Sequence, residues 1–221
     1  MNILSIDSSG PVLSVGIMTQ DKILTISDDT KSRASQTILN IIDKILKDNN
    51  LSSKDLNAII FNKGPASFTG TRISSSIVQA IGYSNNIPVF GISSLSLMAH
   101  TGYVKYKYTK ILCVKKAFSN LVYWAYFNIE KQKFSPLLGN YLTAIDKIKI
   151  ESIDKFYIIS DCKEKIYENK NLNKQVIENI DYKDHDSARK LIDYVIQEEN
   201  LDKPFNHTDT LPDYAGHNMY D

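Results

Sequence analysis

The sequence predicts an α/β protein of two lobes, each built on a mixed five-stranded-type sheet flanked by helices, with the second lobe reduced. Three observations favour this class. Short apolar runs near the start are joined by tight turns, later apolar runs alternate with helical patterns, and the second half shows strand patterns less clearly. With 221 residues, 43% hydrophobic and 23% charged, the chain is long enough for two small domains with an ample core.

The first lobe begins with three predicted strands over residues 3–7, 12–18 and 23–26. Their connections are too short for parallel pairing, so the strands form an antiparallel meander. A helix follows over residues 38–46, where apolar residues form a wide stripe. The run 58–61 is a fourth strand, and it is parallel to its neighbour because a helix connects them.

Two more helices and a fifth strand complete this lobe, which we assign to residues 1–100. A helix is predicted over residues 70–83, a strand over 89–92, and a further helix to about Ala99. Three strands followed by alternating helices and strands are typical of one half of actin, sugar kinases and heat-shock ATPases. Two such halves form the actin-like ATPase fold.

The second lobe is assigned to residues 101–221. Its predicted elements are three strands and one helix, over residues 110–114, 121–127, 156–159 and 187–199. From about residue 201 the chain has the pattern of an irregular tail.

Composition excludes several function classes. The net charge of +1 gives no global field that favours nucleic acid or membranes. The start lacks the pattern of a signal peptide, and no apolar run reaches the roughly 18 residues that a membrane span requires. Cys113 and Cys162 match no metal or redox spacing, and the four histidines lack a His-x-x-x-His pattern, so we expect buried thiols, surface histidines and no metal. The sequence indicates a cytoplasmic protein.

Residues 64–72, Gly-Pro-Ala-Ser-Phe-Thr-Gly-Thr-Arg, are the most informative segment. They turn a strand into a helix N-terminus, where backbone N–H groups can hold an anion or dock on another surface. The order of a nucleotide P-loop is missing, and plain strand-to-helix punctuation explains the turn equally well. The turn residues that we single out are Gly64, Pro65, Ser67, Phe68 and Gly70.

A resemblance rests on four segments in order. Residues 6–9, Ile-Asp-Ser-Ser, resemble an I-D-T-S opening; residues 64–72 resemble G-P-G-S-F-T-G-x-R; and residues 89–95 resemble V-x-G-V-S-S-L. The strand Val122-Tyr-Trp-Ala resembles a strand of the second lobe. Together they resemble the TsaB (YeaZ) family of bacterial tRNA threonylcarbamoyladenosine biosynthesis.

The resemblance implies a non-catalytic relative of the transferase TsaD that binds TsaD as a heterodimer and works with the ATPase TsaE. The assembly modifies adenosine 37 of tRNAs that read codons beginning with A. The chain itself then needs no cofactor, because ATP and Mg²⁺ belong to the partner subunits. It meets tRNA indirectly, meets no membrane, and forms a homodimer when its partner is absent.

The sequence departs from the family pattern in places that bear on catalysis. Ala66 and Ser74 stand where glycines are usual, and Lys116 and Phe118 stand where Asp and Arg are expected. The loss of that carboxylate argues against independent nucleotide hydrolysis. Residues 7–10 (Asp7, Ser8, Ser9 and Gly10) then form a vestigial phosphate loop, whose side chains can equally tie off a turn.

The partner surface is expected on two helices of the first lobe, whose alternative role is only to cover the sheet. The expected interface residues are Ile38, Ile41, Ile42, Ile45, Thr69, Arg72, Ile73, Ser76, Ile77 and Ala80. In residues 103–110, lysines alternate with tyrosines, which is typical of single-stranded RNA binders and also of solvated edge strands. Lys105, Lys107 and Lys110 are therefore candidate tRNA contacts.

Two enzyme readings stay open at this point. The first is a small ATP-dependent kinase or phosphohydrolase that uses Asp7, because a strand-end Asp meets magnesium phosphate in this architecture. The second is a metallopeptidase, for which the histidine spacing gives no support.

Overall fold

The chain divides into two compact units, each described here by itself. A computed structural model describes residues 1–20, 22–29, 34–150, 155–167, 169, 172, 176–182, 186–196 and 205–214. Unit 1 contains Met1–Ser93 and Asp184–Asp213, and unit 2 contains Ser94–Lys183 and Tyr214–Asp221.

The sheet of unit 1 has the strand order β3-β2-β1-β4-β5. Its strands are β1 (Ile3–Asp7), β2 (Leu13–Thr19), β3 (Lys22–Asp28), β4 (Ala58–Gly64) and β5 (Val89–Ser93). β1, β2 and β3 pair antiparallel, β4 pairs parallel to β1, and β5 pairs parallel to β4. The predicted meander and the parallel fourth strand are confirmed.

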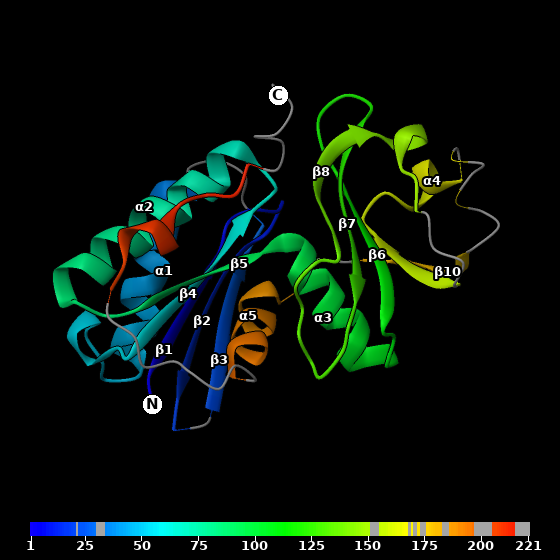
Figure 1. Ribbon diagram of the computed structural model, residues 1–221. Helices are drawn as coiled ribbons and strands as arrows, with labels where there is room; N and C mark the ends of the chain where they lie inside the picture. The colour runs from blue at the N-terminus through cyan, green and yellow to red at the C-terminus, as the bar shows by residue number, and fades with distance from the viewer. Residues whose placement is uncertain are drawn as a thin grey trace. The chain divides into compact units, whose positions relative to one another are not determined.

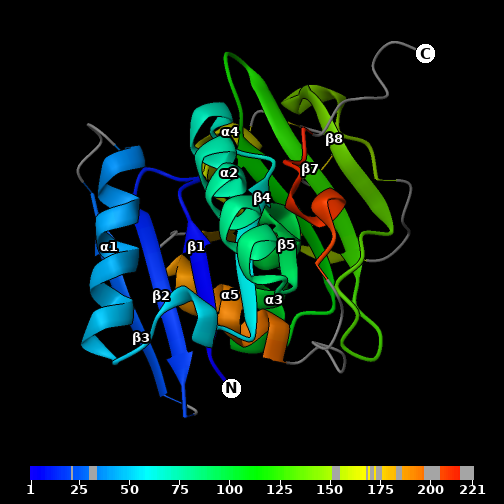
Figure 2. The ribbon, with the colours of Figure 1, turned by 90° about the vertical axis from the view of Figure 1, so that its left-hand side faces the viewer.

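Helices cover both faces of this sheet (Figures 1 and 2). α1 (Ala34–Asp48) and α2 (Phe68–Asn85) cover one face, and α5 (Ser187–Ile196) covers the other; the short η1 (Ser53–Asp55) precedes β4. The side chains of β1 alternate accordingly: Leu4 and Ile6 belong to the core under α1 and α2. On the other face, a Cβ on Gly16 would lie 3.2 Å from Ala188 of α5.

Residues 205–213, which we call the C-terminal strap, return to unit 1 and include η3 (His207–Thr210). The strap lies against three glycines from three elements: Gly64 of β4, Gly82 of α2 and Gly91 of β5. A Cβ at any of these positions would come within 2.9 Å of a strap carbonyl oxygen or of a strap aromatic ring. The glycines therefore provide the close approach that seats the strap.

Hydrogen bonds fasten the strap at two points. Ser75 Oγ of α2 donates to the carbonyl oxygen of Thr210, and the backbone N–H of Asp213 donates to the carbonyl oxygen of Lys63 at 2.7 Å. The expected division at residue 100 is thus corrected. α5 and the strap belong to unit 1 because they pack on its sheet and on α2, and unit 2 already begins at Ser94.

The sheet of unit 2 repeats the connectivity of unit 1, with the order β10-β9-β6-β7-β8. Its strands are β6 (Lys110–Lys116), β7 (Leu121–Asn128), β8 (Leu138–Ala144), β9 (Phe156–Ser160) and β10 (Val176–Asp181). The first three again pair antiparallel and the last two parallel. Both units therefore have the predicted mixed five-stranded sheet, and the α/β class is confirmed.

Unit 2 is reduced on one face. α3 (Ser94–Tyr106) packs closely on the other face, where a Cβ on Gly102 would lie 2.2 Å from Ile159. The core of the reduced face includes residues of η2 (Ile145–Lys147) and of the four-residue α4 (Lys163–Ile166).

Three expectations for unit 2 were wrong. The helix predicted to end near Ala99 continues to Tyr106, so residues 103–106 are helical and do not form an edge strand. Lys110, at the end of the segment 103–110, begins β6, which is a central strand between β9 and β7 and not an edge strand. His100 is buried, with its ring 5.0 Å from that of Phe134, because it lies on the packed part of α3. Both cysteines are buried, as expected; of the other histidines His207 is exposed, whereas residues 185 and 217 lie outside the described residues.

Candidate partner-binding surface

The motif turn joins β4 to α2 through a tightly bonded corner. Gly64 has φ +96°, a backbone conformation that residues other than glycine rarely adopt, and its N–H donates to Asn62 Oδ1 at 3.0 Å. Ser67 is the N-cap of α2, and its Oγ accepts from the N–H of Gly70 at 3.4 Å. The turn therefore begins α2 with a hydrogen-bonded N-cap, and the strand-to-helix turn that the nonapeptide predicted is present.

The loop after β1 is bonded to the first turns of α2. Ser8 Oγ donates to the carbonyl oxygen of Gly70 at 2.6 Å and lies 2.6 Å from Ser74 Oγ. The N–H of Ser67 donates to the carbonyl oxygen of Ser9 at 3.2 Å. A Cβ on Gly70 would lie 1.9 Å from the carbonyl oxygen of Ser8, so this approach requires a glycine.

The carboxylate of Asp7 is buried and accepts hydrogen bonds on both oxygens. Oδ1 accepts from the N–H of Ser9 at 2.8 Å, and Oδ2 accepts from Asn62 Nδ2 at 3.0 Å. Ser8 and Ser9 are also buried, and Gly10 is half-buried. The four predicted loop residues thus lie at the end of β1, where Asp7 and Ser8 join the loop to the end of β4 and to α2.

The exposed side of α2, the helix that lies in front of the sheet in Figure 2, carries most of the predicted interface residues, as their burial shows. Thr69, Arg72, Ser76 and Ala80 are exposed, and Ile73 and Ile77 are half-buried. All of these except Ala80 line a groove of about 450 Å³, whose lining residues are Leu39, Phe68, Thr69, Arg72, Ile73, Ser76 and Ile77. We call this groove and its lining the α2 face.

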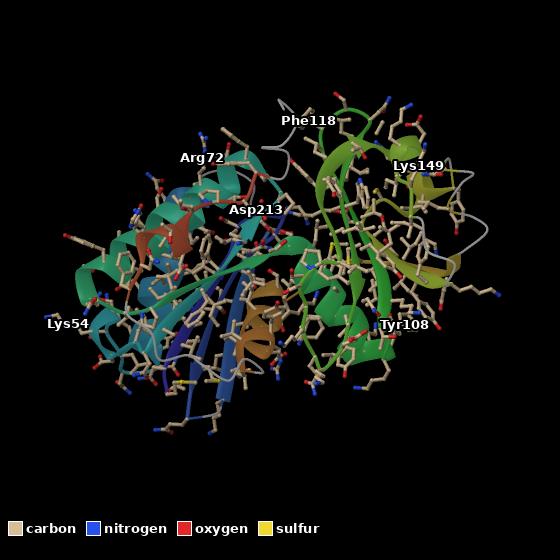
Figure 3. All side chains as sticks on the ribbon, viewed as in Figure 1. Lys54, Arg72, Tyr108, Phe118, Lys149 and Asp213 are labelled. Atoms are coloured by element: carbon tan, nitrogen blue, oxygen red, sulfur yellow. The ribbon has the colours of Figure 1, made fainter. Side chains whose placement is uncertain are left out.

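Phe68 marks one end of the α2 face. Its ring is 59% exposed although it is fully apolar, and the guanidinium carbon of Arg72 lies 3.7 Å from the ring centroid. Figure 3 shows Arg72 at the surface of α2. An exposed aromatic ring next to Arg is the combination that dominates protein interfaces.

The isoleucines of α1 do not contribute to this surface. Ile38, Ile41, Ile42 and Ile45 are at most 8% exposed and belong to the core of unit 1. The expectation that they face a partner is corrected, because the stripe of α1 packs on the sheet and only Leu39, 54% exposed, stays outside. The unusual width of the stripe was the signal for Leu39.

A second groove, of about 690 Å³, lies on the other side of α2. It is lined by Ser76, Gln79, Ala80, Tyr83, Phe205, Asn206 and His207. Tyr83 is 77% exposed, and its ring centroid lies 6.0 Å from that of Phe205 in an edge contact. The sequence did not predict this groove, because nothing in the polar strap indicates that it returns to α2.

The predicted lysines lie in unit 2. Lys105 and Lys107 are exposed, and Lys110 is half-buried at the start of β6. At the other end of β6, Lys115 is buried and its Nζ lies 3.9 Å from Asp161 Oδ2, while Phe118 is 62% exposed (Figure 3).

Within the described part of the chain, His, Cys, Asp and Glu side chains form no group of three or more suited to a metal ion. Among the same residues, no helix has the length and apolar character needed to cross a membrane.

Comparison with known proteins supports both fold and family. A family model described as TsaD, tRNA N6-adenosine threonylcarbamoyltransferase, matches residues 28–180. The chain is 41% identical to TsaB of Buchnera aphidicola from Schizaphis graminum over 122 residues, which are 55% of this chain and 58% of that protein. It is 35% identical to TsaB of Buchnera aphidicola from Acyrthosiphon pisum over 170 residues, 74% of this chain and 76% of that protein. For Escherichia coli TsaB the identity is 32%, over 57% of this chain and 54% of that protein.

Solved structures show the same fold over nearly the whole length. YeaZ from Pseudomonas aeruginosa has a TM-score of 0.77 at 18% identity and covers 96% of this chain and 99% of its own. A Pseudomonas aeruginosa protein described as similar to peptidase YEAZ has a TM-score of 0.80 at 17% identity, covering 97% and 99%.

Two five-stranded sheets with one shared strand order define a protein of the actin-like ATPase fold. The chain belongs to the TsaB (YeaZ) family of tRNA threonylcarbamoyladenosine biosynthesis proteins. The family model carries the name of the paralogous TsaD, as expected for two branches of one fold.

Proposed function

We propose that this chain is a non-catalytic subunit that binds TsaD and is required to form threonylcarbamoyladenosine at position 37 of tRNAs reading codons that begin with A. It acts in the cytoplasm as a heterodimer with TsaD, and TsaE joins the larger complex. The observation that carries the proposal is the α2 face, an exposed apolar surface on a member of the TsaB family.

The α2 face suits a helix of a related protein. Ser76 and Ala80 are small and exposed, so another helix can approach α2 closely. Phe68 and Leu39 provide apolar area on either side of the groove, and each exposes about half of its surface. A partner with the same fold offers equivalent helices, and the two pairs form a four-helix seam. Without TsaD, a second copy of this chain fits the same surface.

The strand ends of the chain do not fit a magnesium phosphate. Both oxygens of Asp7 accept hydrogen bonds from the protein's own N–H groups. At the end of β6 in unit 2, Lys115 places a buried ammonium, which cannot ligate a cation. ATP and Mg²⁺ therefore belong to the partner subunits in this proposal.

A binding measurement on surface variants tests the proposal. Ile77→Asp places a charge in the α2 face and should weaken binding to immobilised TsaD at least thirtyfold, or about 2 kcal/mol. Leu24→Asp is the matched control, since Leu24 is 49% exposed on β3 and lies away from the groove. Equal binding of both variants would refute the assignment of the α2 face.

A modification assay and an ATP hydrolysis assay separate the enzymatic alternative from the proposed function. We expect a modification assay with TsaD, TsaE and tRNA to lose its product when this chain is omitted, and the isolated chain to leave ATP intact. Hydrolysis of Mg-ATP by the isolated chain, lost in Asp7→Asn, would instead establish a phosphohydrolase.

A further inference from the structure

Three tyrosines form a stacked ladder on unit 2. Tyr108 lies 3.4 Å from Tyr157, centroid to centroid, with an angle of 8° between the rings, and it lies 5.2 Å from Tyr106 at 15°. They come from the C-terminus of α3, the residues before β6 and the start of β9, and all three are half-buried. We call Tyr106, Tyr108 and Tyr157 the tyrosine ladder; Figure 3 labels its middle member.

The middle ring of the ladder is held in place. Tyr108 Oη donates to Glu178 Oε2 of β10 at 3.0 Å. Desolvation, followed by this hydrogen bond, raises the pKa of Tyr108 to about 12, so the hydroxyl stays neutral. Tyr108 stacks with both of its neighbours, so we place Tyr106 and Tyr157 at the two ends of the stack.

Three lysines lie near the ladder, in space or in sequence. Lys105 Nζ lies 4.9 Å from the centroid of Tyr106, and Lys107 Nζ lies 5.8 Å from that of Tyr103. Both lysines are exposed, as is Lys155, which lies two residues before Tyr157. Positive charges from two chain segments thus flank flat aromatic surface, the combination that binds single-stranded nucleic acid.

We propose that the tyrosine ladder, with Lys105 and Lys107, binds an unpaired segment of RNA. One base stacks on the outer face of Tyr106, and the two ammonium groups contact the adjoining phosphates. Stacking of a base is stronger than an exposed cation–π contact, so Lys105 can leave the ring for a phosphate. The proposal rests on the proposed function, in which the complex that contains this subunit acts on tRNA.

The arrangement determines what kind of RNA is recognised. A ring face accepts every base, and a lysine contacts phosphate without reading sequence. The site therefore selects unpaired nucleotides over duplex and has little sequence preference. Its affinity falls with salt, because phosphate contacts release counterions.

The test measures binding of the full-length chain to a fluorescein-labelled, unstructured RNA oligonucleotide over a series of salt concentrations. Lys105→Ala combined with Lys107→Ala should reduce the salt slope by about 1.4, or roughly 0.7 per lost single-strand phosphate contact. Tyr106→Leu should weaken binding about tenfold, whereas Tyr106→Phe keeps the ring and should bind like the natural chain. Lys44→Ala combined with Lys54→Ala removes two exposed lysines of unit 1 as the matched control (Figure 3).

Binding to TsaD is measured on the same variants. Ladder variants that bind TsaD normally but bind RNA poorly support the proposal, even if Ile77→Asp shows the α2 face to be misassigned. The proposal is overturned if the lysine pair variant keeps the salt slope of the control, or if Tyr106→Phe loses as much affinity as Tyr106→Leu. Loss of TsaD binding with unchanged RNA binding would make the ladder a protein contact and would also overturn it.

Discussion

The two units share one strand order but carry opposite charges at the same place in it. In unit 1, Ile6 pairs with Phe61, so the next residues, Asp7 and Asn62, lie side by side. In unit 2, Val114 pairs with Ser160. The next residues there are Lys115 and Asp161, which form an ion pair at 3.9 Å. Equivalent positions hold a carboxylate in one unit and an ammonium in the other.

This difference teaches that one strand order can hold different polar pairs at the same strand ends. The carboxyl ends of parallel strands are where α/β proteins usually bind ligands. Here each polar pair joins adjacent strand ends within its own unit. The helices differ as well: unit 1 has α1 and α2 and with them an exposed apolar face, whereas the described residues on the corresponding face of unit 2 form the short helices η2 and α4.

The largest effect is expected where the loop of unit 1 meets α2. In Gly70→Ala the new Cβ would lie 1.9 Å from the carbonyl oxygen of Ser8. Because both atoms are attached directly to the main chain, no side-chain rotation can relieve the contact. We expect a loss of roughly 3 kcal/mol or more in the free energy of unfolding. Urea unfolding measures this loss, with Thr69→Ala at the exposed neighbouring position as the control. A midpoint equal to that of the control would show that the loop does not need a glycine at position 70.

The two polar pairs should differ in what they contribute. In Asp7→Asn the new amide must place an N–H against Ser9 N–H or Asn62 Nδ2, and Asn62 cannot flip without losing its bond from Gly64. We expect a loss of about 2 kcal/mol. Asp161→Asn keeps the hydrogen bond from Lys116 N–H and weakens a long ion pair whose carboxylate is 29% exposed, so we expect a smaller loss of about 1 kcal/mol. Denaturant midpoints of the two variants rank them; the reverse order would contradict the comparison.

A smaller effect is expected at the C-terminal strap, which packs on unit 1 although it lies far from the strands of that unit in the sequence. Gly91→Ala places a Cβ 2.9 Å from the carbonyl oxygen of Asp209, and the strap can shift to relieve the contact. We expect about 1 kcal/mol of destabilisation together with faster proteolysis of residues 205–213. Unchanged proteolysis would show that the strap is seated without this glycine.

Local sequence patterns predicted much of the fold, but contacts between segments far apart in the sequence could not be predicted from them. The meander and the motif turn were predicted because short connections, Gly64 and Gly70 dictate them locally. The stripe of α1 indicated an apolar helix but not which side meets the sheet, so four isoleucines were assigned to the wrong surface. The strap and the pairing of Lys115 with Asp161 depend on contacts between distant segments, which leave no periodicity in the sequence.

The smallest effect concerns the ladder of unit 2 and its pH dependence. The pKa of Tyr108 is raised from 10.0 to about 12 by desolvation and by Glu178, so the folded state favours the neutral hydroxyl. This stabilisation is complete below pH 10 and is lost as the pH rises through about 12. In a pH titration followed by the ultraviolet absorbance of tyrosinate, Tyr108→Phe should have one fewer tyrosine that ionises at high pH than the natural chain. Tyr123, whose pKa is raised by burial, should still ionise late in that variant, so an unchanged late phase would mean that Tyr108 ionises like an ordinary surface tyrosine.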